Sequence, residues 1–277
     1  MNHPGWLRLG ALRATELVPA RLELHWALQV PAALGIARAT PTPDFAHHSV
    51  HWDPSQRALV GARVEKPRAH RAGLRFEDLA LLLLSEKDAL VEALPLAGRT
   101  LAEAFAWLDA ASARYTGVEQ APLARPQHEL ADHPLAHGAR FGAAPAAGMQ
   151  ELARWFADLA SVLGARRDGR DATPVRVWSH HFDMDTVLTL GGERTLGLGF
   201  SPGDDSYAEP YLYALPTPYP DERALPELAA PMEWVTDGWI GAVLRGSHVA
   251  ALAPAAQAEL AARFYRAAEE ALAKASS

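Results

Sequence analysis

The sequence predicts an α+β fold made of two related units, each consisting of a helix, four strands and a closing helix, with mostly antiparallel sheets flanked by the helices. Two observations predict it. Short features recur in the same order at nearly one offset along the chain, which indicates an internal duplication. In each half, segments of helical periodicity enclose a series of short apolar or alternating runs, as in a layered α+β unit.

The recurring features lie 129 to 132 residues apart, as the differences 155 − 26 and 209 − 77 show. One of them is a Ser-x-His-aromatic-Asp pattern, which occurs once in each half. Three such features in one order favour a duplicated architecture, where the first feature comprises two matched pairs with the same offset of 129. The matched pairs are Trp26 with Trp155, 34–35 with 163–164, 49–53 with 179–183, and 77–84 with 209–215.

The first unit is expected to open with a helix over residues 18–37, which Pro31 should bend or split because proline removes a backbone donor. Strands are predicted at 49–52 and 57–64, on either side of the turn-forming tetrapeptide Asp53-Pro54-Ser55-Gln56.

The next segments, 74–84 and 89–94, are apolar enough for one long helix or two strands. The polar tetrapeptide at 85–88 (SEKD) between them favours a hairpin. Thr100 and Glu103 then form a capping box that begins a closing helix.

The second unit repeats the order. An apolar stripe from Met149 to Leu163 predicts its first helix, and a stripe from Leu260 to Ala271 after Pro254 predicts its last. The predicted organisation is a first repeat over 1–116, a Pro-, Ala-, Gly- and His-rich linker over 117–147, and a second repeat over 148–277 with an insertion at 216–238. We expect the two repeats to form one pseudo-symmetric body.

The composition excludes several classes of protein. The chain has 277 residues and no cysteine, which excludes disulfide scaffolds, thiolate nucleophiles and Cys-ligated metal sites. Its formal net charge of −7 argues against a nucleic-acid partner, because phosphate contacts need clustered Lys and Arg. No apolar run approaches the roughly 18 residues of a membrane span, so we expect no membrane partner and a soluble, cytoplasmic protein.

The first candidate site is Trp178 to Asp185 (WSHHFDMD). On a strand, alternate side chains share a face, so His181 and Asp183 would lie side by side. Such a pair can act as a catalytic base with its orienting acid, or as two metal ligands. His51 and Asp53 repeat the pair, and a twofold relation between the halves would bring four ligands together for a divalent zinc, manganese or iron ion. The alternative is that these histidines are structural and bond to the backbone.

The second candidate site follows a strand in which Gly197 and Gly199 leave one face without side chains. Such a face permits close approach by a ligand or by another segment of the chain. The acidic and aromatic residues that follow would suit a small polar ligand, or would form a hairpin whose tyrosines pack under the insertion. Together with two residues of the first site, the predicted ligand-binding residues are Trp178, His180, Asp204, Asp205, Tyr207, Glu209 and Tyr211.

The stretches Val177–Asp183 (VWSHHFD) and Gly197–Tyr213 (GLGFSPGDDSYAEPYLY) resemble a family of uncharacterised bacterial proteins. That family shares a Trp-Pro-His-His-Phe-Asp stretch and a Ser-Pro-Gly-Asp stretch followed by Tyr-x-Glu-Pro-Tyr, and Ser179 stands where it has proline. The resemblance covers residues 175–215. It implies no particular activity, but it selects these two stretches as the part of the chain where function should be sought.

Two classes of function fit these residues. One is a hydrolase-like enzyme that acts on a small polar ligand in a His-, Asp- and Tyr-lined cleft, with His181 and Asp183 as catalytic residues. The other is a non-catalytic protein that binds a small molecule, or that binds a protein partner through a surface formed by the insertion at 216–238 with Trp234 and Trp239. The sequence does not decide between them and predicts no oligomeric state.

Overall fold

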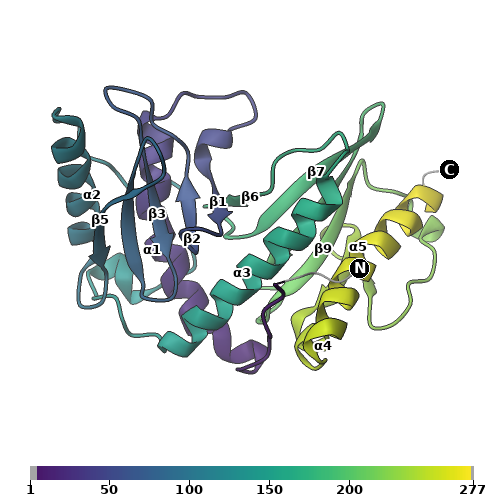
Figure 1. The fold of residues 1–277 in the computed structure, drawn as a ribbon. Coiled ribbons are helices and arrows are strands. Elements are labelled where there is room, and N and C mark those ends of the chain that lie inside the picture. The colour runs from purple at the N-terminus through teal and green to yellow at the C-terminus, as the bar shows by residue number, and fades with distance from the viewer. Residues whose placement is uncertain (1–4, 276–277) are drawn as a thin grey trace. The chain divides into compact units, whose positions relative to one another are not determined.

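The computed structural model describes residues 5–275, and the chain divides into two compact units (Figure 1). We call residues 19–153 with 176–182 the N-unit. The C-unit comprises the described part of 1–18 together with 154–175 and 183–275. The chain therefore passes between the units at four points: inside two helices, at 18/19 and 153/154, and outside helices at 175/176 and 182/183.

Within its described residues, the N-unit contains the antiparallel strand order β6-β1-β2-β3-β4-β5 and two long helices that belong to it almost entirely. The helix α2 packs on β4 and β5. Every residue of β4 from Ala80 to Leu84 is buried, as expected for a strand that is covered on both faces. The elements are α1 (Val18–Arg38), β1 (Ser49–Asp53), β2 (Ala58–Gly61), β3 (His70–Arg75), β4 (Ala80–Ser85), β5 (Leu90–Pro95), α2 (Leu101–Thr116) and β6 (Arg176–Trp178).

The C-unit contains the antiparallel order β10-β11-β9-β8-β7 among its described residues. The last helix, α5, packs on β9. Trp155 of α3 stacks on Phe200 of β8 with ring centroids 5.7 Å apart, and Phe156 meets the same ring edge-on. The elements are α3 (Ala146–Arg167), which begins in the N-unit, β7 (Met184–Gly191), β8 (Arg194–Ser201), β9 (Tyr211–Thr217), β10 (Glu233–Val235), β11 (Gly241–Arg245), α4 (Gly246–Ala250) and α5 (Pro254–Ala275).

Four short 3-10 turns complete the regular structure of the described residues. They are η1 (Ala14–Leu17), η2 (Ala46–His48), η3 (Pro134–His137) and η4 (Glu222–Ala224).

The predicted α+β class and antiparallel pairing are confirmed, and so are the helices. The helix at 18–37 is α1, which continues through Pro31 without splitting. The capping box of α2 is present: Thr100 Oγ1 accepts from the Glu103 amide at 3.2 Å, and Glu103 Oε2 accepts from the Thr100 amide at 2.7 Å. The apolar stretch after Arg75 forms the β4–β5 hairpin, with Leu84 opposite Leu90, and not one long helix.

The expectation of four strands in each half is wrong, because the first half contains β1 to β5 among its described residues. The predicted strand over 74–84 combines the end of β3 with β4. A turn at Phe76–Leu79 separates them, closed by a 3.1 Å hydrogen bond from the Leu79 amide to the Phe76 carbonyl. Leu79 adopts a positive φ of 45° there. The turn contains neither glycine nor proline, and Asp78 alone is a weak signal for a turn.

Residues 117–147 lie entirely within the N-unit. Apart from η3, the segment has little regular structure, but Leu123, Leu135 and Phe141 are buried. It is therefore a packed part of the unit. In the predicted insertion at 216–238, β10 pairs with β11.

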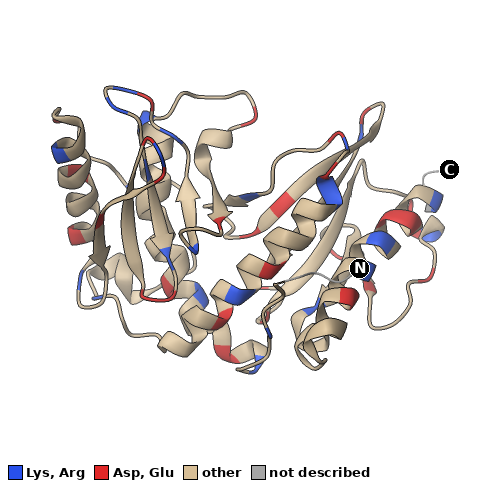
Figure 2. Ribbon diagram, in the orientation of Figure 1, with Lys and Arg blue, Asp and Glu red and all other residues tan. Residues whose placement is uncertain are grey.

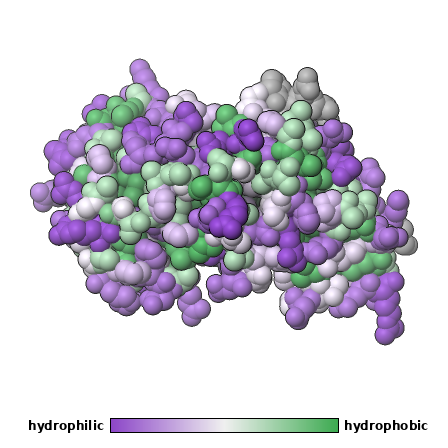
Figure 3. Space-filling view, turned by 90° about the horizontal axis from the view of Figure 1, so that it is seen from below, coloured by the Kyte–Doolittle hydropathy of each residue, from purple (hydrophilic) through white to green (hydrophobic). Residues whose placement is uncertain are grey.

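Acidic and basic residues are interspersed on the elements (Figure 2), and polar and apolar residues are mixed on the face seen from below (Figure 3). Within the C-unit, Glu269 of α5 is ion-paired with both Arg166 and Arg170. No helix among residues 5–275 is both long and apolar enough to cross a membrane.

Candidate functional site

The His-His-Phe stretch of the first candidate site forms a turn, which corrects the strand expected over 178–185. β6 ends at Trp178, and the Phe182 amide donates to the Trp178 carbonyl at 2.7 Å. Phe182 has a positive φ of 61°, a strained conformation for an aromatic residue. Its ring is buried, stacked on His25 at 5.3 Å and tilted against Phe76 at 6.1 Å. Burial of the Phe182 ring thus holds a conformation that local sequence does not favour.

The helix α1 fixes this turn through the residue that precedes the two histidines. The Ser179 carbonyl accepts hydrogen bonds from His25 Nε2 at 3.0 Å and from Gln29 Nε2 at 2.8 Å. His25 and Gln29 lie four residues apart, so both face the turn from one side of the helix. The Ser179 hydroxyl donates to the His48 carbonyl at 3.2 Å.

Several imidazole rings gather at the turn. The His180 ring lies 4.3 Å from His181, 5.8 Å from His128 and 6.0 Å from Trp178. Burial, together with the neighbouring histidines, lowers the pKa of His180 to about 4. Burial also lowers the pKa of His25 to about 4, although its bond to the Ser179 carbonyl acts in the opposite direction. Both imidazoles are therefore neutral at pH 7, whereas His181 is exposed on the surface of the turn.

The second His-x-Asp pair, on β1, has structural partners. Asp53 Oδ1 accepts from the Ser55 amide at 2.8 Å and from the Gln56 amide at 3.1 Å, so it stabilises the β1–β2 turn. Burial lowers the pKa of His51, which stands opposite Val60 in the β-ladder.

The predicted metal ligands are His51, Asp53, His181 and Asp183. In the described range 5–275, no group of three or more His, Cys, Asp or Glu side chains is placed to hold one metal ion. Metal binding and hydrolysis by these residues remain predictions.

In the C-unit, the second candidate site forms a cluster of tyrosines and carboxylates. Asp204 Oδ1 accepts from the Ser206 and Tyr207 amides, and its Oδ2 accepts from the Tyr211 hydroxyl at 2.5 Å. Burial and the bond to Asp204 raise the pKa of Tyr211. The rings of Tyr207 and Tyr211 lie 4.9 Å apart. Glu209 Oε2 accepts from the Ser247 amide at 2.7 Å. Most of the predicted ligand-binding residues here therefore have partners within the chain.

The bare face of β8 is also covered from within the chain. Tyr213 lies opposite Gly199 in the β8–β9 ladder, and its ring rests on the space that a Gly199 side chain would fill. The Tyr213 hydroxyl donates to Asp183 Oδ2 at 2.6 Å, and burial is the main cause that raises its pKa. Of the two explanations for these glycines, approach by another chain segment is the one observed.

Alanine in place of Asp204 is expected to lower the free energy of unfolding by about 1–2 kcal/mol, because the Tyr211 hydroxyl and two loop amides lose their acceptor. Asp205, which is exposed, provides the matched control, and its replacement by alanine should change stability by no more than about 0.5 kcal/mol. Urea unfolding measures both. Equal effects would contradict a structural role for Asp204.

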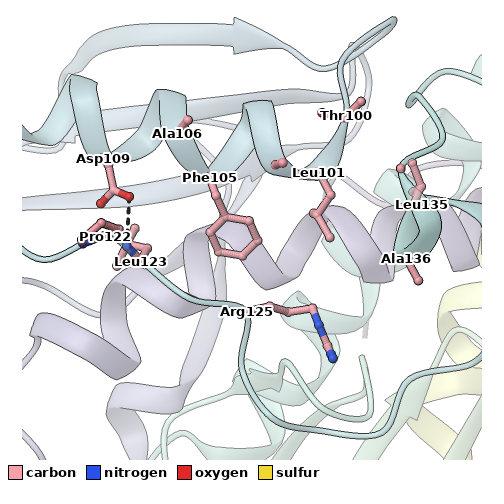
Figure 4. A pocket seen from close by; sticks show the side chains of 12 residues that line it. Thr100, Leu101, Phe105, Ala106, Asp109, Pro122, Leu123, Arg125, Leu135 and Ala136 are labelled. Carbon is pink, nitrogen blue, oxygen red and sulfur yellow. Dashed lines mark hydrogen bonds between the residues drawn. The ribbon is translucent and has the colours of Figure 1, made fainter.

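A pocket of about 650 Å³ lies in the N-unit between α2 and the segment 122–138 (Figure 4). Leu101 and Phe105 point from α2 toward this segment, and Arg125 lies on the side opposite the helix. The remaining lining is mostly small or apolar. The lining residues are Thr100, Leu101, Ala102, Phe105, Ala106, Asp109, Pro122, Leu123, Arg125, Leu135, Ala136 and Gly138.

The wall of the pocket is fixed by a partly buried ion pair. Asp109 of α2 binds Arg38 of α1 at 2.6 Å and accepts from the Leu123 amide at 2.9 Å. Arg38 also donates to the Ala121 carbonyl at 2.9 Å. Further along, Trp26 Nε1 donates to the Ala131 carbonyl at 3.1 Å. Side chains of α1 and α2 thus hold this segment in place, although most of the segment has no regular secondary structure.

The pocket was not predicted from the sequence, because residues 117–147 have the composition of a linker. Leu123, Leu135 and Phe141 were the available signal, since a solvated linker has no need of large apolar residues.

Comparisons with models of protein families, with curated proteins and with solved structures find no significant match to this chain.

Proposed function

We propose that this protein binds a small molecule, and that its binding site is the pocket between α2 and residues 122–138. The observation that carries the proposal is the pocket itself. Its volume of about 650 Å³ and its largely apolar lining with a few polar groups are those of small-molecule sites in proteins. Arg38 and Asp109 support a pre-formed site. They pair with each other and also bind the backbone of the loop, and so they hold the loop against the helices.

The neutral fluorescent probe N-phenyl-1-naphthylamine tests the proposal, since its emission rises in an apolar site. We expect saturable binding to the wild type and a loss of about tenfold or more in affinity for Ala106→Trp, whose indole would occupy the pocket. Ala255→Trp, at an exposed position at the start of α5, is the matched control and should bind as the wild type does. Unchanged binding by Ala106→Trp, or no binding by the wild type, would overturn the proposal.

We also infer that the two halves arose by duplication. Each half runs from a long helix through several strands to a closing helix. In the N-unit, β1 pairs antiparallel with β6, and Ser49 lies opposite Trp178, next to its counterpart Ser179. Antiparallel pairing of two equivalent strands places a local twofold axis between them, and this pairing supports the inference.

A further inference from the structure

Arg125 is an unusual charged group for its position in the pocket wall. It is half-buried, with its guanidinium carbon 5.4 Å from the centre of the Trp26 ring. Nη1 donates to the Pro126 and His128 carbonyls at 3.2 and 3.3 Å. Among the residues that the structure describes, Arg125 has no carboxylate partner, and its Nε and Nη2 atoms donate to no protein acceptor.

The lack of a carboxylate partner distinguishes Arg125 from most other arginines of the N-unit. Most of them are ion-paired with a carboxylate that lies nearby. These pairs are Arg38–Asp109, Arg57–Glu77, Arg63–Glu65, Arg71–Asp88, Arg75–Asp78, Arg114–Glu92, Arg140–Glu103 and Arg176–Asp44.

The carboxylate that lines the pocket does not compensate Arg125. Asp109 is already bound to Arg38 and to the Leu123 amide. The pocket therefore joins a largely apolar surface to one positive charge. Partial burial makes an uncompensated charge costly, so an anion that approaches it from the pocket would be bound more strongly than at an exposed arginine.

We propose that the ligand is an amphipathic organic anion, a carboxylate on an aromatic or aliphatic body. Its acid group binds Arg125, and its body packs on Phe105, Leu101 and Leu135. The Nε and Nη2 atoms form one edge of the guanidinium, and that edge can hold both oxygens of a carboxylate in parallel hydrogen bonds. The Pro126 and His128 carbonyls accept only from Nη1, so they hold the guanidinium in place and leave this edge available to a ligand. The inference rests on the proposed function, since it names the ligand class of the same pocket.

The test compares 2-naphthoate with its neutral analogue 2-naphthamide, measured by displacement of N-phenyl-1-naphthylamine from the wild type, Arg125→Gln and Arg114→Gln. Arg114 is the matched control, because it is exposed on the same helix that lines the pocket, is not part of the lining and pairs with Glu92. We expect the wild type and Arg114→Gln to bind the naphthoate about tenfold more tightly than the amide, whereas Arg125→Gln loses this preference and keeps its affinity for the amide.

Equal affinities of the wild type for the two compounds would overturn the anion proposal and leave the binding pocket standing. If Arg125→Gln loses affinity for both compounds, the anion proposal is also overturned, because Arg125 would then only maintain the structure of the pocket wall. If the wild type binds neither compound nor the probe, the proposed function itself fails.

Discussion

Replacement of Gly199 by alanine is expected to lower the free energy of unfolding by about 1–3 kcal/mol. A β-carbon at this position would overlap sterically with the Tyr213 ring. That ring cannot move aside at low cost, because it is buried and its hydroxyl is bonded to Asp183. The backbone cannot shift freely either, since the Gly199 carbonyl accepts from the Tyr265 hydroxyl at 2.8 Å.

Gly197→Ala is the matched control for this experiment. It lies two residues away on the same strand and the same face, but its β-carbon would meet the Leu215 carbonyl oxygen at 3.6 Å, an ordinary contact. Alanine there should leave stability within about 1 kcal/mol of the wild type, and the lower entropy of the unfolded chain acts in its favour. Urea unfolding of the three proteins gives the comparison. A Gly199→Ala variant as stable as Gly197→Ala would show that Tyr213 does not depend on a bare strand.

The parts of the fold that could be predicted are those in which local pattern and tertiary packing agree. The capping box of Thr100 and Glu103 begins α2 because its hydrogen bonds join residues only three apart. The β4–β5 hairpin could be predicted for a similar reason, since a polar tetrapeptide separates two apolar runs. Such elements need little information from the rest of the chain.

The candidate sites depend on contacts between distant residues, and there the sequence is less informative. The stretch around Phe182 alternates as a strand would, yet His25 and Gln29, about 150 residues earlier, bind the Ser179 carbonyl and select a turn. The wall that carries Arg125 has no periodicity of its own, because the side chains of Arg38, Asp109 and Trp26 hold it from outside. A constraint supplied by other elements leaves no repeating pattern in the segment it acts on.

Acidification from pH 7.5 to 4.5 is expected to lower the free energy of unfolding, with about 2–3 kcal/mol of the loss due to His25. Its pKa in the folded protein is about 4, below the ordinary value of 6.5. The unfolded chain therefore binds a proton at His25 over the range from about 6.5 down to 4, while the folded chain does not. Stability that is present above pH 6.5 is lost as the pH falls through this window.

The cause is the position of His25 between the Ser179 carbonyl and the buried Phe182 ring, where Arg21, His128 and His181 further oppose a positive charge. Most carboxylates titrate only toward the acid end of this window, since their ordinary pKa values are about 4. Glutamine at position 25 can still donate to the Ser179 carbonyl but cannot bind a proton. The stability of the His25→Gln variant should therefore change less with pH than that of the wild type.

Urea unfolding at pH 7.5, 6.5, 5.5 and 4.5 measures this difference for the wild type, His25→Gln and His248→Gln. His248 is exposed on the short helix α4, so its replacement should leave the pH dependence of the wild type intact. Because each variant is compared with itself across pH, a constant cost of the His25→Gln change does not affect the result. Equal slopes for His25→Gln and the wild type would mean that His25 gains its proton in the folded protein as easily as in the unfolded chain, and that the turn at Ser179 imposes no penalty on its charge.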